Sequence, residues 1–280
     1  MKFEDLLIKA ALKEDVGSKD ITTSAIIPKQ LKIKADIQFK EPGVLCGIEI
    51  AERTFRLLDE NLRFLPTAKD GEWIEKNREV AYIEGPAASV LAGERTALNF
   101  LGFLSGIATQ TRAFVDKVKG TNAKILDTRK TTPTLRALEK YAVLTGGGVN
   151  HRQGLYDEAL IKDNHLRILR KQPLEQIVAV VKQSVLKKTV VGIEVKNLAE
   201  LKEALKTKAD YILLDNMTPE TVREAVNLRK RMESGIAFEV SGGIRLDNVH
   251  DYAQIGVERI SVGSLTHSAP SIDVSLDIVG

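Results

Sequence analysis

The part of the chain after Gly120 repeats one pattern six times: a short apolar segment ends in polar or glycine residues and is followed by helical periodicity. The six apolar segments with their polar ends span residues 125–130, 160–164, 191–196, 212–216, 238–243 and 260–264. Alternating strands and helices predict a parallel sheet, because neighbouring parallel strands need a crossover connection. This part of the chain therefore predicts an α/β fold, built on either a barrel or an open doubly wound sheet.

We favour a barrel, because polar residues stand at the C-terminal end of every predicted strand, where barrel enzymes gather their catalytic groups. Six units are fewer than the eight of a complete barrel, so the sequence predicts an incomplete six-stranded α/β barrel. Two prolines support helices between the strands. Pro133 follows Thr132 and Pro219 follows Thr218, which places each proline in the first turn of a predicted helix.

The first hundred residues follow a different pattern, typical of a small α/β unit. Residues 31–39 alternate strictly between apolar and polar side chains, which predicts a strand with one solvated face and thus an antiparallel sheet. Periodicity predicts a helix from residue 48 to residue 58, followed by short strands at 62–65 and 79–83. From residue 87 to residue 119 the pattern is helical again, with Gly102 and Gly106 as expected breaks.

Composition excludes several classes of protein. The chain has 41 Lys and Arg against 38 Asp and Glu, a net charge of +3, so neither nucleic acid nor a membrane is an expected partner. A hydrophobic content of 43% excludes a disordered chain, and a single cysteine, Cys46, excludes a disulfide framework or a multi-cysteine zinc site. The first residues are acidic where a signal peptide is basic, and no apolar run reaches the ~18 residues of a membrane span. We expect a cytoplasmic globular protein.

The densest group of candidate functional residues is cationic. It comprises Arg95, Arg129, Lys130, His151, Arg152 and Lys162. Most lysines and arginines simply face solvent, but all of these except Arg95 follow the ends of the first two predicted barrel strands, among Gly and Thr residues. Together they predict a pocket for a polyanionic small molecule.

Glycine-rich ends of the last two predicted strands indicate a phosphate site. Residues 241–243 read Ser-Gly-Gly and residues 262–264 read Val-Gly-Ser. Glycine lets the backbone approach a ligand closely, and a following helix directs free N–H groups at an anion. Loops after the last strands of a barrel often bind phosphate. The alternative is a pair of tight turns that bind nothing.

Two acidic residues, Glu194 and Asp215, end successive predicted strands. Their carboxylates suit Mg²⁺ ligation, binding of ribose hydroxyls, stabilisation of a cationic transition state or general acid–base catalysis. Ion pairing with nearby lysines is the structural alternative. The glycines at 146–148 predict a turned loop that can cover the site, and His165 and His267 lack the spacing of metal ligands.

Three of these segments resemble the quinolinate phosphoribosyltransferase family: residues 127–133 (DTRKTTP), 146–152 (GGGVNHR) and 160–165 (LIKDNH). The resemblance extends over nearly the whole chain, and it includes residues 14–17, 20–23, 43–47, 93–99, 214–217 and 265–269. It implies an N-terminal α/β sandwich at residues 1–110, with the C-terminal tail 266–280 packing on it, and a six-stranded α/β barrel at residues 111–265.

The resemblance also implies a reaction. Quinolinate attacks phosphoribosyl pyrophosphate in the presence of Mg²⁺, pyrophosphate and CO₂ leave, and nicotinate mononucleotide for NAD biosynthesis results. Residues facing quinolinate would be Thr128, Arg129, Lys130, His151 and Arg152, joined by Arg95 from the other subunit of a homodimer. Lys162 would lie between the two substrates and act in catalysis with Glu194 and Asp215, which contact the metal through Mg-pyrophosphate. The 5-phosphate would be held by Ser241, Gly242, Gly243, Val262, Gly263, Ser264 and His267.

Some positions depart from the pattern of the family. Thr134, Leu144 and Gly192 stand where a glycine, a basic residue and a glutamate are frequent. Leu144 and Gly192 change the local charge balance relative to the family, so the sequence does not predict the reaction rate or the substrate affinity. Three alternatives remain: a related transferase acting on another acid, an aldolase that uses Lys162 as a Schiff base, and a non-catalytic anion-binding protein. Two carboxylates at strand ends argue against the last, since they weaken the binding of a bare anion.

Overall fold

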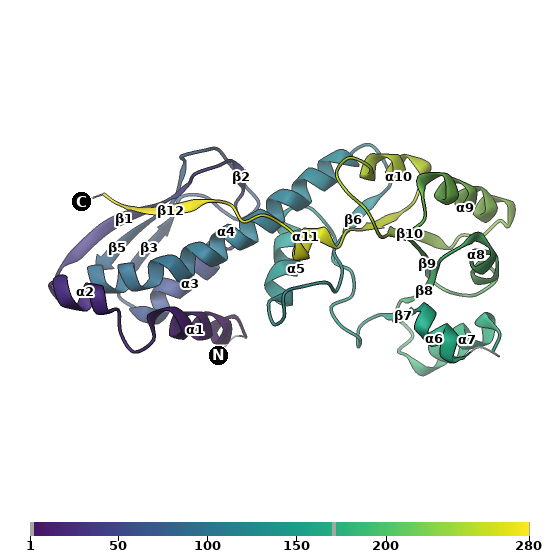
Figure 1. The fold of residues 1–280 in the computed structure, drawn as a ribbon, viewed down its shortest axis with the longest axis horizontal. Coiled ribbons are helices and arrows are strands. Elements are labelled where there is room, and N and C mark those ends of the chain that lie inside the picture. Colours follow the sequence, from purple (N-terminus) through teal and green to yellow (C-terminus); the bar gives the residue numbers. More distant parts are fainter. Residues whose placement is uncertain (1–2, 170–171, 280) are drawn as a thin grey trace. The chain divides into compact units, whose positions relative to one another are not determined.

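The computed structural model describes residues 3–169 and 172–279 (Figure 1). Its chain divides into two compact units. The first unit contains the chain up to Gln110 and the segment from Ala269 onward, and the second unit is Thr111–Ser268. Helix α4 (Ala87–Lys117) contributes residues to both units. No helix within the described ranges is long and apolar enough to cross a bilayer.

An antiparallel sheet forms the first unit, in the order β12-β1-β5-β3. The bounds of its strands are β1 (Lys32–Phe39), β3 (Arg63–Pro66), β5 (Glu79–Pro86) and β12 (Val274–Ile278), and a small second sheet pairs β2 (Gly43–Val44) with β4 (Trp73–Ile74). The helices are α1 (Phe3–Val16), α2 (Ile21–Ile26), α3 (Ile48–Leu58) and the first part of α4. Helices α3 and α4 bury their apolar faces against the sheet, and Phe55 of α3 packs on Phe64 of β3. The strand and helix predicted over 31–39 and 48–58 are both present.

The predicted breaks in α4 are wrong, since the helix runs unbroken through Gly102 and Gly106. A Cβ atom at Gly102 would lie 2.5 Å from the carbonyl oxygen of Ile272, and one at Gly106 would lie 2.0 Å from that of Pro270. Both glycines therefore make room for the C-terminal segment, which crosses the helix before β12 pairs antiparallel with β1. Glycine here serves a close backbone approach rather than a helix break.

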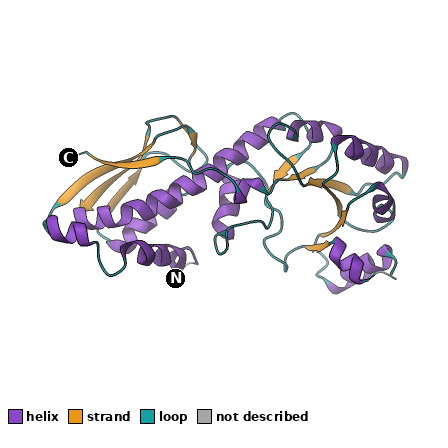
Figure 2. Ribbon diagram, in the orientation of Figure 1, coloured by secondary structure: helices purple, strands orange, loops and turns teal. Residues whose placement is uncertain are grey.

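Six parallel strands form the sheet of the second unit, in the order β6-β11-β10-β9-β8-β7. They are β6 (Lys124–Leu126), β7 (Ala159–Ile161), β8 (Val191–Val195), β9 (Tyr211–Asp215), β10 (Ala237–Ser241) and β11 (Arg259–Ser261). Each of the six predicted strands is present, and the strands curve into an arc with helices outside (Figure 2). The incomplete α/β barrel is thereby confirmed.

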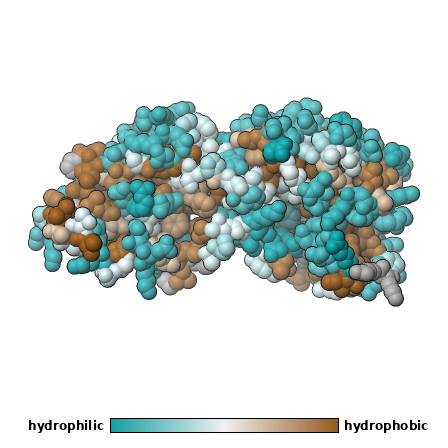
Figure 3. Space-filling view, in the orientation of Figure 1, coloured by the Kyte–Doolittle hydropathy of each residue, from teal (hydrophilic) through white to brown (hydrophobic). Residues whose placement is uncertain are grey.

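Helices lie between these strands along the chain, and one more follows the last strand. They are α5 (Arg136–Thr145), α6 (Asp163–Ile168), α7 (Leu174–Ser184), α8 (Leu198–Ala204), α9 (Pro219–Arg231), α10 (Val249–Ile255) and α11 (Ser264–His267). Helix α9 buries Val222, Ala225 and Val226, and the visible surface over α9 and α10 is mostly hydrophilic (Figure 3). This division is typical of helices that cover a sheet on one side and face solvent on the other.

The two predicted helix starts have different outcomes. Thr218 caps α9 by accepting a hydrogen bond from the amide of Thr221, with Pro219 in the first turn as predicted. Pro133, in contrast, lies before α5, which begins at Arg136. The φ angle of Thr134 is 70°, in the left-handed region, so the chain turns there and a helix cannot continue from Pro133.

Candidate active site

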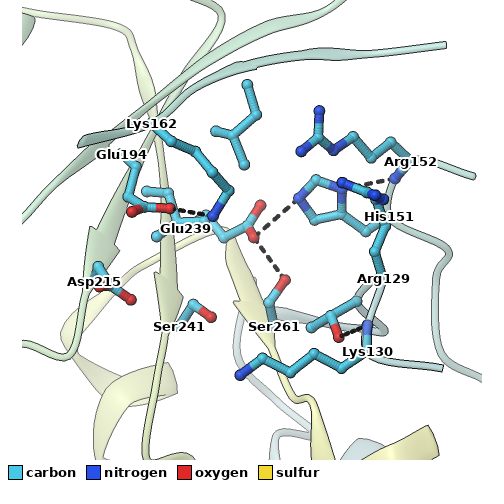
Figure 4. Close-up of a pocket in the computed structure, with 13 residues that line it drawn as sticks. Arg129, Lys130, His151, Arg152, Lys162, Glu194, Asp215, Glu239, Ser241 and Ser261 are labelled. Carbon is cyan, nitrogen blue, oxygen red and sulfur yellow. Dashed lines mark hydrogen bonds and ion pairs between the residues drawn. The ribbon is translucent and has the colours of Figure 1, made fainter. Parts of the chain in front are cut away.

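A cavity of about 340 Å³ opens at the C-terminal ends of the barrel strands. Its lining residues are Thr128, Arg129, Lys130, His151, Arg152, Leu160, Lys162, Glu194, Leu213, Asp215, Glu239, Ser241 and Ser261 (Figure 4). The strand register explains this set. Glu194 pairs with Leu213 and Leu213 with Glu239, while Asp215 pairs with Ser241 and that serine with Ser261. Alternate residues of a strand share one face, so two successive rows of side chains point into the barrel.

Cations line one side of the cavity. Arg129 and Lys130 follow β6, and Arg152 lies in the segment that connects α5 to β7. Burial lowers the pKa of the Arg129 guanidinium below its usual value, and the positive charges of Arg152 and Arg136 lower it further. These cationic side chains repel one another, and a bound anion would offset that repulsion. This side of the cavity therefore suits a small molecule with more than one negative charge.

The position of these cations depends on a buried ion pair behind them. Lys140 Nζ lies 2.5 Å from Asp127 Oδ1 and donates to the carbonyl oxygen of His151 at 2.8 Å. The same Asp127 oxygen accepts the amide hydrogen of His151 at 2.8 Å. Residue Val149 forms a parallel bridge with Leu126 of β6, so the segment before His151 lies along the open edge of the sheet. The segment along this open edge is thus what brings His151 and Arg152 to the cavity.

Lys162 and the two acids lie on the opposite side of the cavity (Figure 4). Lys162 Nζ donates to Glu194 Oε2 at 2.6 Å, and the Glu194 side chain is buried. An ammonium group held by a carboxylate is a poor nucleophile, which argues against the Schiff-base alternative. Glu194 therefore does form the ion pair with a lysine that the sequence left open as an alternative role. Asp215, at the end of β9, lines the same cavity.

In the first of the two glycine-rich loops, the backbone has the left-handed conformation that only glycine adopts easily. Gly242 and Gly243 have φ angles of 95° and 65°, and a Cβ at Gly242 would lie 2.2 Å from Asn216 Oδ1. Gly263 lies close to Lys130, because a Cβ there would be 3.2 Å from the Cδ of that lysine and 3.2 Å from His267 Nε2. Both loops therefore stand at the same end of the barrel as the cations.

Several residues of the site were not predicted from the sequence. Glu239 and Ser261 line the cavity, and Glu158, Tyr211 and Arg259 lie behind it in contact with one another. Glu239 is fully buried in the middle of β10. A charged residue flanked by Phe238 and Val240 in an otherwise apolar strand is the signal that marks it, because a buried charge needs a partner.

Two family models match the chain. The N-terminal domain of quinolinate phosphoribosyl transferase matches residues 20–105, and the C-terminal domain matches residues 107–277. This chain belongs to the quinolinate phosphoribosyltransferase family.

Relatives in the quinolinate phosphoribosyltransferase family are similar over almost the full length. A probable nicotinate-nucleotide pyrophosphorylase (carboxylating) of Methanocaldococcus jannaschii is 43% identical over 279 residues, which cover 98% of this chain and 96% of the relative. Quinolinate phosphoribosyltransferase (decarboxylating) 1b of Nicotiana tabacum is 38% identical and covers 97% of this chain and 81% of its own length. The crystal structure of nicotinate-nucleotide pyrophosphorylase from Ehrlichia chaffeensis has a TM-score of 0.92 at 39% identity, and covers 100% and 99% of the two chains.

The residues expected from the family resemblance lie in three places. The cavity is lined by nine of them: Thr128, Arg129, Lys130, His151, Arg152, Lys162, Glu194, Asp215 and Ser241. Gly242, Gly243, Val262, Gly263, Ser264 and His267 follow the last two strands outside this lining. Arg95 lies on α4 in the other unit, where its exposed side chain is 3.8 Å from Glu94.

The side chains of the cavity can be compared with what an Mg²⁺ ion, the cofactor expected from the family resemblance, would need. Among the described residues, no three His, Cys, Asp or Glu side chains are grouped to hold a metal ion. Glu194 already accepts from Lys162, and His165 and His267 accept or share local hydrogen bonds with Lys162 N and Ser268. Two carboxylates beside a cationic cavity suit a metal that arrives with a pyrophosphate group, which supplies most of the oxygen ligands.

Proposed function

We propose that this chain transfers the phosphoribosyl group of phosphoribosyl pyrophosphate to quinolinate and releases nicotinate mononucleotide, a precursor of NAD. The ring nitrogen of quinolinate bonds to the anomeric carbon of the ribose, and pyrophosphate leaves with the electron pair of the broken C–O bond. The 2-carboxylate then leaves as CO₂, and the ring carbon takes up a proton in its place. The family membership and the names of the relatives support this proposal.

The observation that carries the proposal is the division of one cavity into a cationic side and an acidic side. Arg129, Lys130 and Arg152 form the cationic side and Glu194 and Asp215 the acidic side, with Lys162 held by Glu194. Quinolinate is a dianion, and arginine donates two parallel hydrogen bonds to a carboxylate. Several fixed cations can therefore orient the ring so that its nitrogen faces the second substrate.

On the acidic side we propose that Glu194 and Asp215 stabilise the positive charge that builds on the ribose as pyrophosphate departs. Preorganised carboxylates in a partly buried cavity interact with such a charge more strongly than water does. Glu194 and Asp215 would also be the residues that hold Mg²⁺ if it is supplied together with the pyrophosphate group of phosphoribosyl pyrophosphate, whose negative charge it would offset. Lys162 lies between the substrates and offers its ammonium group to the developing negative charge.

For the 5-phosphate we propose the two glycine-rich loops, with Ser241, Gly242 and Gly243 in one loop and Gly263 and Ser264 in the next. Val262 and His267 flank the second loop and complete this site. The proximity of Gly263 to Lys130 supports the assignment, because a phosphate there would also meet that ammonium group. Backbone N–H groups next to glycine can approach a phosphate closely.

We further propose that the chain works as a cytoplasmic homodimer in which Arg95 of one subunit completes the quinolinate site of the other. The exposure of the Arg95 side chain supports this role, because the guanidinium faces solvent and its contact with Glu94 on the same helix is long, at 3.8 Å. The single, buried Cys46 suits a reducing compartment.

The test combines the purified chain with quinolinate, phosphoribosyl pyrophosphate and Mg²⁺. Release of CO₂ from quinolinate labelled at the 2-carboxyl group, in equal amount to nicotinate mononucleotide, is the expected result. Nicotinate, which lacks the 2-carboxylate, is the matched control and should react poorly. Turnover with a different acid and none with quinolinate would instead assign the chain to a related transferase.

A further inference from the structure

A buried carboxylate lies directly behind the proposed dicarboxylate site. Glu239 is fully buried and lines the same cavity as Arg129 and Arg152. Although burial raises its pKa, hydrogen bonds from His151 and Ser261 and the positive charge of Arg259 bring the pKa of the Glu239 carboxyl below its usual value, so Glu239 is ionised. A negative charge next to a site for a dianion weakens the binding of that dianion. The presence of Glu239 here therefore calls for another role.

Two donors hold Glu239 and fix which of its oxygens faces which neighbour. Arg259 Nε donates to Oε2 at 2.6 Å, and Ser261 Oγ donates to Oε1 at 2.6 Å. The guanidinium of Arg259 also stacks on the ring of Tyr211, 4.4 Å from its centroid. Glu239 Oε1, the oxygen shared with Ser261, lies 3.3 Å from Nε2 of His151 (Figure 4).

The other ring nitrogen of His151 is an acceptor. The amide N–H of Arg152 donates to Nδ1 at 2.7 Å, so Nδ1 carries no proton and Nε2 carries it. Two further groups face the ring: Glu158 Oε1 lies 3.5 Å from Nδ1, and the Tyr211 hydroxyl lies 3.5 Å from Nε2. Tyr211 donates its hydrogen to that Glu158 oxygen at 2.6 Å, so its hydroxyl can only accept from Nε2–H. The carboxylate of Glu239 is the nearer of the two acceptors that face this N–H group, at 3.3 Å, and it is the charged one.

We propose that Glu239 is a positioning residue: it holds His151 in the Nε2–H tautomer, so that Nδ1 fixes the backbone of Arg152 and the guanidinium of Arg152 is aimed at the dicarboxylate. This inference deepens the proposed function and rests on it for the identity of the ligand. His151 then shapes the cavity as a neutral ring, and its two nitrogens bind the protein rather than quinolinate. Arg152 Nη1 donates to the carbonyl oxygen of Glu158 at 3.1 Å, so the arginine is anchored at both ends.

The variant Glu239→Gln tests the proposal by reversing one hydrogen bond. Arginine has donors only, so Arg259 must face the amide oxygen of the new side chain. The amide NH₂ group then faces Nε2 of His151 and donates to it. This interaction forces the proton to Nδ1, which can no longer accept from the amide of Arg152. The substitution therefore changes the tautomer while the volume of the side chain stays almost the same.

Two readouts are expected to move together. In long-range ¹H–¹⁵N correlation spectra of histidine-labelled protein, the His151 signals of the wild type should have the Nε2–H pattern and those of Glu239→Gln the Nδ1–H pattern. The His151→Asn variant assigns these signals. The KM for quinolinate should rise about tenfold, as expected for loss of one charge-assisted hydrogen bond, while kcat and the KM for phosphoribosyl pyrophosphate stay within about twofold.

Two control variants separate positioning from general damage. Glu258→Gln makes the same chemical change at the Glu258–Arg229 ion pair of the same barrel, outside the cavity, and should leave both readouts unchanged. Ser261→Ala removes one donor to Glu239 but should leave the His151 tautomer unchanged.

An Nδ1–H pattern for His151 in the wild type would overturn the proposal even if Glu239→Gln fails to fold. So would a folded Glu239→Gln protein with an unchanged tautomer or an unchanged KM for quinolinate. The spectra need no turnover, so a wild type with the expected tautomer and no activity on quinolinate would count only against the proposed function.

Discussion

Gly192 of β8 lies opposite Tyr211 of β9, and a Cβ atom at Gly192 would lie 2.2 Å from Cζ of the tyrosine ring. The glycine thus provides the space in which the ring stacks under Arg259 and its hydroxyl reaches Glu158. The family resemblance predicts a glutamate at position 192, and the size of the neighbouring Tyr211 accounts for the glycine found there.

Gly192→Ala should therefore displace Tyr211 and lower the free energy of unfolding by about 1–3 kcal/mol, the usual cost of overpacking a core. Urea denaturation followed by circular dichroism measures this change. Gly235→Ala is the matched control, because a Cβ at Gly235 meets no atom within 4 Å, and it should change stability by less than about 0.5 kcal/mol. Equal effects at the two glycines would mean that Tyr211 moves aside without cost.

Arg129→Lys should raise the KM for quinolinate by roughly tenfold and leave kcat nearly unchanged, because lysine keeps the charge and loses the paired hydrogen bonds. Arg129→Ala should have a larger effect in the same direction. Steady-state kinetics with each substrate varied in turn separates the two constants. Arg56→Ala, at a surface ion pair with Glu52 in the first unit, is the control that should leave both constants at the wild-type value.

Asp215→Asn should lower kcat by about a hundredfold, a loss typical of one electrostatic contact to a transition state. The KM for quinolinate should change little, because Asp215 lies on the acidic side of the cavity. Single-turnover measurement of the transfer step checks this expectation. A kcat equal to that of the wild type would refute the role assigned to Asp215.

Asp36 should make stability depend on pH. Burial raises the pKa of the Asp36 carboxyl, and the charges of Asp277 and Glu79 raise it further, while its Oδ1 atom has no hydrogen-bond partner. The folded pKa exceeds the unfolded pKa, so the stability that protonated Asp36 contributes is present below about pH 4 and is lost as pH rises through the folded pKa.

Asp36→Asn should accordingly raise the free energy of unfolding at pH 7 by about 1 kcal/mol, the order of the cost of a buried unpartnered polar atom. The gain should shrink as the pH falls to 4. Thermal unfolding at several pH values measures both effects. Asp247→Asn, at an exposed ion pair with Arg245, should show neither, and a gain that does not vary with pH would exclude titration of Asp36 as its cause.

Sharing of the site between subunits predicts complementation. When Arg95→Ala and Asp215→Ala proteins are mixed under conditions that exchange subunits, activity should recover to roughly a quarter of the wild type, because half of the dimers are hybrid and each has one intact site. Mass spectrometry of intact dimers confirms that hybrids form. Hybrid dimers without activity would show that Arg95 serves its own subunit.

Much of the second unit could be predicted from its sequence because each strand carries its own signal. An apolar segment followed by a polar residue identifies β8 and β9 and places Glu194 and Asp215 at one end of the sheet. Parallel strands bring those ends together whatever the details of the packing. The fold class and the cationic cavity follow from such local patterns, and the comparisons with known proteins confirm the fold class.

Features that depend on contacts between distant segments were missed or misread. Gly102 and Gly106 appear as helix breaks in the sequence, whereas they accommodate a tail that lies about 170 residues later in the chain. Glu239 has no motif of its own, and its importance follows only from its contacts with His151 and Arg259 on other segments. The periodicity of apolar residues predicts which face of a helix or strand is buried, but it does not predict which residues of other segments contact that face.

The crossing of α4 by the C-terminal segment has a consequence for biosynthesis. Strand β12 follows the whole barrel sequence along the chain, and it pairs with β1, which precedes the barrel. The ribosome therefore makes the entire barrel sequence before the four-stranded sheet of the first unit can be completed. Although its first strands are made before the barrel, the first unit receives its last strand after the barrel.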